Sequence, residues 1–185
     1  MDGRWYRAKG SVNVMLIIGV VVIAVAAVLR SGVYRHWRTY HATILYMVLC
    51  NLLYYFLVKD RLLWKYSPDY VFDHSASELL ITFIVFPCTV MLFLHAMTTT
   101  NGARRIAHFV KWIVIYLVVE WLGSLFGVID YHDGWGFLWS IFFVATMFPM
   151  LLLHHYRPLI AYGVSVVIIA FYLLTLRIPF PPPPS

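Results

Sequence analysis

The residue with the clearest capacity for chemistry is Glu120, a carboxylate in the middle of an apolar run that extends from 111 to 129. An ionised acid at the centre of a bilayer costs about 2.5–3.5 kcal/mol on insertion scales. Such residues therefore usually face the interior of a helical bundle, where they pair with polar groups or serve ion and substrate pathways. Glu120 is our first candidate for a functional residue.

Polar residues in other apolar runs could reach the same depth. At 3.6 residues per turn, Tyr116 shares a helical stripe with Glu120. Asn51 interrupts the run 42–58, and Pro87 frees a backbone carbonyl near the middle of the run 78–97. If the centre of each run marks the bilayer midplane, Asn51, Pro87 and Glu120 lie at one depth. The predicted ligand-binding residues are Glu120, Asn51, Tyr116, Thr89 and Glu78.

The stripe that carries Glu120 continues with small residues, Gly123 or Ser124 and then Gly127. Small side chains let another helix approach closely, so we expect Glu120 to face a neighbouring helix. A structural alternative stays open. Asn51 and Tyr116 could simply satisfy a protonated Glu120 and fix helix packing, because a neutral acid is cheaper to bury than a charged one.

A second polar group follows directly in the chain and consists of Asp130, His132, Asp133 and Trp135. Its residue types suit a metal or an acid/base pair, but three ligands within four positions and no distant fourth do not define a metal centre. We predict no metal and interpret the group as a secondary interfacial cluster in a glycine-containing turn. The sequence has no nucleotide-binding loop, nucleophile elbow, HExxH or CxxC pair, so we assign no catalytic residue and expect no cofactor.

The composition identifies the elements that must hold these residues. Hydrophobic residues make up 62% of the 185 residues, charged residues 12%, and the mean hydropathy is +0.80, which is too apolar for an ordinary soluble domain. Spanning helices need about 20 apolar residues each, and the alternating pattern of a barrel strand is absent. We predict an all-α integral membrane protein, a bundle of six transmembrane helices. The expected spans are 12–29, 42–58, 78–97, 108–129, 137–153 and 158–176.

The two ends of the chain lie outside this predicted bundle. Residues 1–11 form a basic N-terminal segment and 177–185 a proline-rich tail, expected to be extended. An alternative for the first apolar run is a signal peptide cleaved near Ala24-Val25-Ala26, although the apolar run continues to Leu29.

The distribution of charged residues along the chain indicates which partners to expect and how the helices are oriented in the membrane. The formal charge is +6, but Lys and Arg are spread in small groups without a continuous basic face, so we expect the lipid bilayer, and no nucleic acid, as partner. With six spans, the two termini and the second and fourth connectors lie on one side of the membrane, and the other three connectors lie on the opposite side. Each side then has seven Lys and Arg residues. The first, third and fifth connectors contain no acid, however, and this favours those connectors in the cytoplasm and both termini outside.

Several blocks of the sequence together resemble a known family. They are YRHWRTYHATILYMVLCNLLYYFL, LLWKYSP, HSASELLITFIVFPCTVMLFL, EWLGSLFGVIDYHDGW, WSIFF and MFPMLLLHHYRPLIAY, within 34–162. In this order they resemble an uncharacterised family of small multi-pass membrane proteins from Gram-positive spore-forming bacteria. The resemblance implies a bacterial source and the cell membrane as location, and it carries no established activity. The chain departs from the family at Cys50 and Tyr55, where relatives have a glycine and an amide.

Three functions fit these observations. The first is binding or transport of a proton or a small cationic or amphipathic ligand at an intramembrane Glu/Asn site, with a homodimer as an option because the chain is short for a transporter. The second is a non-catalytic membrane partner or sensor. The third is a membrane-embedded enzyme acting on a lipid or isoprenoid, with aromatic walls around cationic intermediates. The sequence does not identify the ligand.

Overall fold

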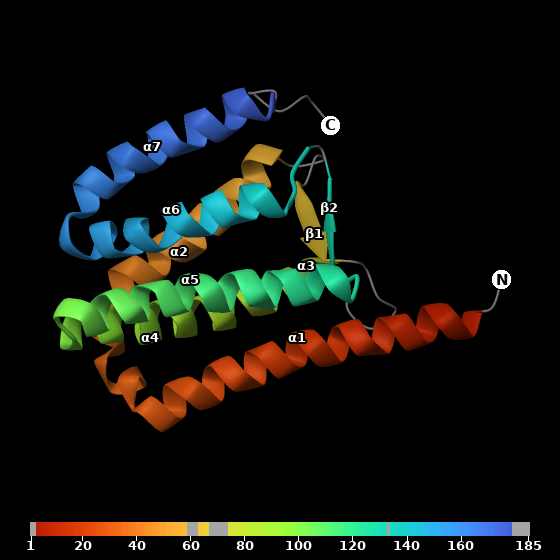
Figure 1. Cartoon of the computed structure of the whole chain (residues 1–185), viewed down its shortest axis with the longest axis horizontal. Coiled ribbons are helices and arrows are strands. Elements are labelled where there is room, and N and C mark those ends of the chain that lie inside the picture. Colours follow the sequence, from red (N-terminus) through yellow and green to blue (C-terminus); the bar gives the residue numbers. More distant parts are fainter. Residues whose placement is uncertain (1–2, 59–62, 67–73, 133, 179–185) are drawn as a thin grey trace.

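The computed structural model describes residues 3–58, 63–66, 74–132 and 134–178, and their side chains except those of 3–14, 64–66 and 74–76. Long helices dominate this part of the chain (Figure 1). They are α1 (Gly3–Ser31), α2 (Trp37–Val58), the continuous unit of α3 (His74–Leu80), η2 (Ile81–Val85) and α4 (Phe86–Thr99), α5 (Gly102–Leu125), α6 (Phe137–Tyr156) and α7 (Pro158–Thr175). A short 3-10 helix, η1 (Val33–His36), precedes α2.

Five helical units are long and apolar enough to cross a membrane. They are Val33–Val58, Ser77–Thr99, Gly102–Leu125, Phe137–Tyr156 and Pro158–Thr175. The first predicted span, 12–29, lies within α1. In the part of α1 with described side chains, the apolar helix is Met15–Ser31, which is shorter than the five units above. The predicted helical fold is therefore confirmed, with five membrane-length apolar helices in the described residues.

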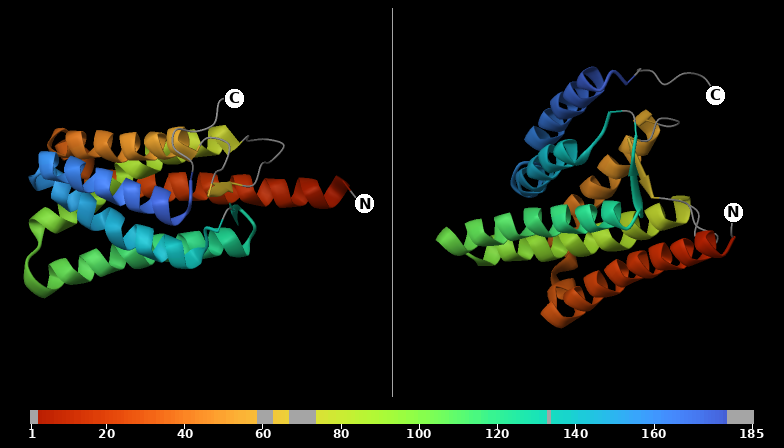
Figure 2. Two further views of the ribbon diagram at one scale, coloured as in Figure 1. Left: turned by 90° about the horizontal axis from the view of Figure 1, so that it is seen from above. Right: turned by 45° about the vertical axis from the view of Figure 1, so that its right-hand side comes forward.

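Helix α4 lies at the centre of the arrangement. It packs against α1, α2, α5 and α6, whereas α7 lies at one edge and packs mainly on α6 (Figure 2). The core is built from fully buried side chains of α4 and α6, among them Phe93 and Phe148, whose ring centroids are 4.8 Å apart. Aromatic rings bury a large area each, so this contact is a major source of cohesion between the two helices.

An irregular segment precedes Pro87. Proline lacks the backbone N–H and clashes with the carbonyl four residues earlier, and the sequence therefore predicts a kink. The irregularity takes the form of the π-helical turn η2, after which Pro87 lies in the first turn of α4. Single π turns of this kind are common at functional sites.

A small sheet joins the second and fourth connectors. Strand β1 (Trp64–Tyr66) pairs antiparallel with β2 (Ile129–Tyr131). The sequence-based boundary extended the fourth helix to 129, but α5 ends at Leu125. Gly127 adopts φ +67°, which suits glycine, and the Val128 amide donates to the Gly123 carbonyl over 2.7 Å. This tight turn reverses the chain and starts β2.

We predict that Phe148→Ala lowers the free energy of unfolding by about 3–5 kcal/mol, because it leaves a cavity against Phe93. Phe56→Ala is the matched control, since Phe56 is 67% exposed and Phe148 is 0% exposed. Thermal unfolding in detergent, followed by circular dichroism, measures both. Equal losses in the two variants would contradict the proposed core.

Candidate functional site

The tightest polar cluster of the described residues joins α2 to the α3–η2 unit. The Asn51 amide Nδ2 donates to Glu78 Oε1 over 2.6 Å and to Thr82 Oγ1 over 2.8 Å. The Thr82 hydroxyl also donates to Glu78 Oε1, over 3.2 Å. Glu78 and Thr82 are one helical turn apart, so their side chains lie on the same face of their own helical unit. This face contacts Asn51 of α2. We refer to Asn51, Glu78 and Thr82 as the Glu78 cluster.

The carboxyl group of Glu78 is satisfied on one side only. Its residue is 6% exposed, and Oε2 is buried without a hydrogen-bond partner in the described structure. Leaving a buried polar atom unpaired costs about 1–3 kcal/mol, and more if the group is charged. The Glu78 cluster thus contains a buried acid that is positioned through one oxygen, while the other oxygen has no partner among the described residues.

Tyr116 and Thr89 form a separate pair. The Tyr116 hydroxyl donates to Thr89 Oγ1 over 2.9 Å, and the Tyr116 ring meets Phe148 edge-on at 5.2 Å. The pair therefore ties α5 to α4 within the aromatic core.

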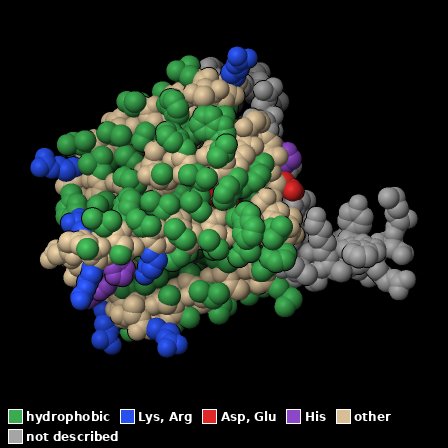
Figure 3. Space-filling view, in the orientation of Figure 1, with side chains coloured by type: hydrophobic (Ala, Val, Ile, Leu, Met, Phe, Trp, Pro, Cys, Tyr) green, Lys and Arg blue, Asp and Glu red, His purple; other side chains and the backbone are tan. Residues whose placement is uncertain are grey.

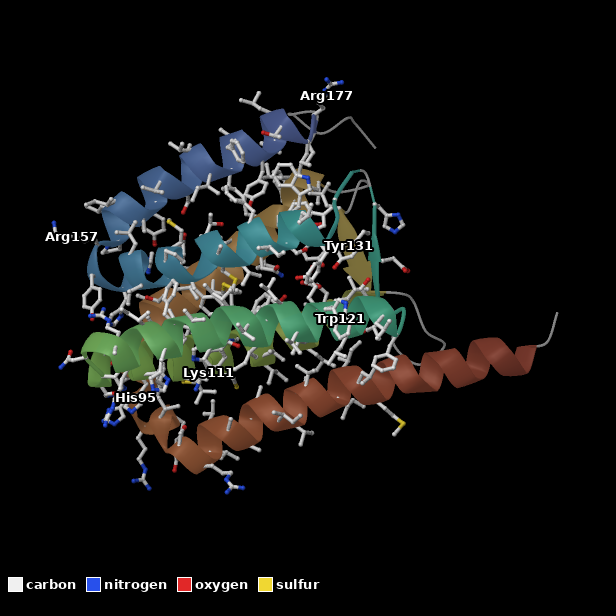
Figure 4. All side chains as sticks on the ribbon, viewed as in Figure 1. His95, Lys111, Trp121, Tyr131, Arg157 and Arg177 are labelled. Carbon is white, nitrogen blue, oxygen red and sulfur yellow. The ribbon has the colours of Figure 1, made fainter. Side chains whose placement is uncertain are left out.

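Glu120 belongs to a third group, near the end of α5. The Tyr131 hydroxyl of β2 donates to Glu120 Oε1 over 3.0 Å. We expected a neighbouring helix to approach closely at Gly123. A close contact exists there, but it is made by Ile129 of β2. A Cβ at Gly123 would lie 2.8 Å from Ile129 Cδ1. Glycine thus lets β2 lie against α5 and bring Tyr131 to Glu120. Figure 4 shows Tyr131 on β2 next to the end of α5 that carries Trp121, the residue after Glu120.

Tyr131 remains a proton donor at neutral pH. Burial raises the pKa of its phenol, and the adjacent Glu120 carboxyl raises this pKa further. An elevated tyrosine pKa keeps the hydroxyl protonated well above pH 7. The contact is therefore a stable anchor between β2 and α5.

The described members of the secondary interfacial cluster do not form a metal-binding group. Asp130 pairs in register with Lys65 in the small sheet, and His132 is exposed, with its backbone N–H donating to the Leu63 carbonyl over 2.8 Å. The indole Nε1 of Trp135 donates to Ser140 Oγ over 3.0 Å. Asp133 lies outside the described residues. Within the described chain, no group of three His, Cys, Asp or Glu is arranged to hold a metal ion.

A further polar group, the His154 cluster (Thr43, Tyr46, His154, Tyr162 and Ser165), joins α2, α6 and α7. Thr43 Oγ1 is 3.1 Å from His154 Nδ1, and Tyr162 OH is 3.2 Å from His154 Nε2. The Tyr46 ring stacks on the imidazole at 4.2 Å, and its hydroxyl lies 2.7 Å from Ser165 Oγ. His154, only 2% exposed, is thus held on both nitrogens.

The structure thus divides the predicted site residues among three groups. It brings Asn51 together with Glu78, and Tyr116 with Thr89, while the partner of Glu120 is Tyr131. The predicted ligand-binding residues did not include Thr82, which lies four residues after Glu78 on the same stripe of the helix. They also did not include Tyr131, which lies in a strand that the sequence did not predict. No family model, curated protein or solved structure matches the chain.

We expect Tyr131→Phe to loosen the small sheet, because the variant leaves Glu120 without its phenol donor. Loss of one such hydrogen bond corresponds to about 1–2 kcal/mol, or roughly a tenfold increase in the hydrogen-exchange rate of the Val128 and His132 amides. Tyr156→Phe is the control, since Tyr156 is 55% exposed. Unchanged exchange in Tyr131→Phe would show that the phenol does not anchor β2.

Proposed function

We propose that this chain is a multi-pass membrane protein that binds and conducts a proton or another small cation at the Glu78 cluster. The observation that carries the proposal is the buried Glu78 carboxyl, with Oε1 held by Asn51 and Thr82 and with Oε2 unpartnered. Glu78 lies at the start of the apolar helix Ser77–Thr99. Acids within membrane helices usually face the bundle interior and mark ion or proton pathways.

The surface of the helices supports placement in a bilayer. Large apolar side chains project outward along most of the length of the bundle, as the space-filling view shows (Figure 3). Examples are Leu159, Leu138 and Leu174, which are 83%, 80% and 79% exposed. Apolar exposure on this scale is costly in water and favourable in hydrocarbon. Location in a bacterial cell membrane is part of the same proposal and is drawn from the family resemblance.

A line of polar groups along α2 supports conduction as well as binding. Beyond the Glu78 cluster, Cys50 and Tyr46 lie one helical turn apart on α2. One turn further on, Thr43 contacts His154 near the opposite end of the helix. From Asn51 to Thr43 this line covers about 12 Å at 1.5 Å per residue. Hydroxyl, thiol and imidazole groups can each donate and accept a hydrogen bond, as a proton relay requires.

The backbone at Thr82 supports a movable site. Thr82 lies in the π-helical turn η2, directly before the Pro87 turn. Non-regular helix in a membrane segment is tolerated where it lines a buried site or cavity. A change between π and α geometry would shift Thr82 relative to Glu78 and alter the hold on the carboxyl.

A second candidate function is a non-catalytic membrane partner or sensor, in which the Glu78 cluster only fixes helix packing. The short Asn51–Glu78 bond favours this candidate, because interhelical hydrogen bonds stabilise membrane bundles by about 0.6–2 kcal/mol each. The two functions differ in one measurable respect. A packing device conducts nothing when its fold is intact.

We predict that Glu78→Gln reduces proton flux at least about tenfold in proteoliposomes under an imposed membrane potential, because glutamine keeps the hydrogen bonds but cannot titrate. Flux is followed with an internal pH-sensitive dye. Glu120→Gln is the matched control and should retain flux, since Glu120 is bonded to Tyr131 outside the α2 line. Wild-type flux in folded Glu78→Gln protein, or no flux in the wild type, would reject conduction through Glu78.

The same proposal places the first, third and fifth connectors in the cytoplasm. We predict that Asn101→Cys, in the third connector, reacts with a membrane-impermeant maleimide only after cells are permeabilised. His132→Cys, in the fourth connector, should react in intact cells. Both positions are exposed, so accessibility depends on the side of the membrane. The reverse labelling pattern would invert the proposed orientation.

A further inference from the structure

The first turns of α5 carry a basic hollow. Arg104, Ala107, His108 and Lys111 line an open cavity of about 170 Å³, which we call the α5 hollow. The spacing of four and then three residues places Arg104, His108 and Lys111 on one side of the helix. The small side chain of Ala107 lies between them and leaves room for a ligand.

The lining of the α5 hollow suits an anion with several acceptor oxygens. A guanidinium, an ammonium and an imidazole can donate several hydrogen bonds to one phosphate group. The positive end of the α5 dipole adds to the attraction within the first turns.

The charge around the α5 hollow has one sign. We call the end of the bundle that includes this hollow the basic end. In Figure 3 most of the Lys and Arg side chains that the structure describes gather at this end, and the acidic side chain visible in this view lies toward the other. The cationic side chains at the basic end are Arg30, Arg35, Arg38, Arg104, Arg105, Lys111 and Arg157. The described acids are Glu78, Glu120 and Asp130, so no described carboxylate competes for the α5 hollow.

The surface next to the α5 hollow distinguishes a lipid from a free phosphate. Lys111 lies about two and a half turns into α5, where the helix is otherwise apolar. The same face continues with Ile115, Val118 and Leu122, which are 39%, 46% and 37% exposed. A polar head above an exposed apolar stripe matches the shape and chemistry of a phospholipid, whereas inorganic phosphate would leave the stripe unused.

We propose that the α5 hollow binds the phosphate group of an anionic phospholipid, with the acyl chains lying along Ile115, Val118 and Leu122. This site is separate from the Glu78 cluster, and it does not depend on conduction. It holds one lipid at a defined position on α5, in addition to the general attraction between the basic end and an anionic membrane surface.

The test uses the full-length protein in detergent, titrated with phosphatidylglycerol or phosphatidylcholine and analysed by native mass spectrometry. We expect the wild type to retain phosphatidylglycerol in preference to phosphatidylcholine. Arg104→Gln/Lys111→Gln should weaken phosphatidylglycerol binding about tenfold or more, because it removes two charge-assisted contacts. Both residues are exposed on a helix, where glutamine is well tolerated.

The matched control is Arg35→Gln/Arg38→Gln, which removes the same charge from exposed positions at the same end of the bundle. It should bind phosphatidylglycerol nearly as the wild type does. Equal weakening in both double variants would overturn the proposal in favour of diffuse electrostatic attraction. Displacement of the lipid by millimolar inorganic phosphate would also overturn it, in favour of a free-phosphate site. If the double variant does not fold, Lys111→Gln alone provides the same comparison against Arg38→Gln.

Discussion

The arrangement of this bundle depends on how the buried Glu78 carboxyl is accommodated. Within an apolar helical bundle, each polar side chain must find partners on neighbouring helices or remain unpaired at a cost. Glu78 finds Asn51 on α2 and Thr82 one turn along its own helix, and both bonds converge on a single oxygen. These bonds fix the position of the α3–η2 unit against α2. They also create the half-satisfied acid on which the proposed function rests.

The same requirement explains the other interhelical contacts. Tyr116 with Thr89 joins α5 to α4, and Tyr131 with Glu120 joins the small sheet to α5. His154 with Thr43 joins α6 to α2. Hydrophobic burial alone gives little preference for one helix pairing in hydrocarbon, because lipid tails are as apolar as leucine. Directional polar contacts of this kind can select neighbours and register.

Much of this structure could be predicted from the sequence because apolar runs of membrane length have few alternatives to helix. The residue types of the candidate site could also be predicted, since Asn51 and Glu120 stand out in apolar surroundings and Glu78 begins an apolar run. Their division into separate groups could not. The pairing of Asn51 with Glu78 and Thr82 depends on the offset and tilt of two helices, which packing decides. Strand β2 is three residues long, too short for any periodic pattern, and Tyr131 therefore remained hidden as the partner of Glu120.

The central claim is that the Glu78 carboxyl takes up and releases a proton within the folded bundle. Infrared difference spectroscopy of the protein in lipid, recorded between acidic and alkaline buffer, tests this claim most directly because a protonated carboxyl has its own C=O stretching band. Our account predicts one component of the C=O stretching region that is present in the wild type and in Glu120→Gln and is absent in Glu78→Gln. A difference spectrum that is unchanged in folded Glu78→Gln protein would contradict the account.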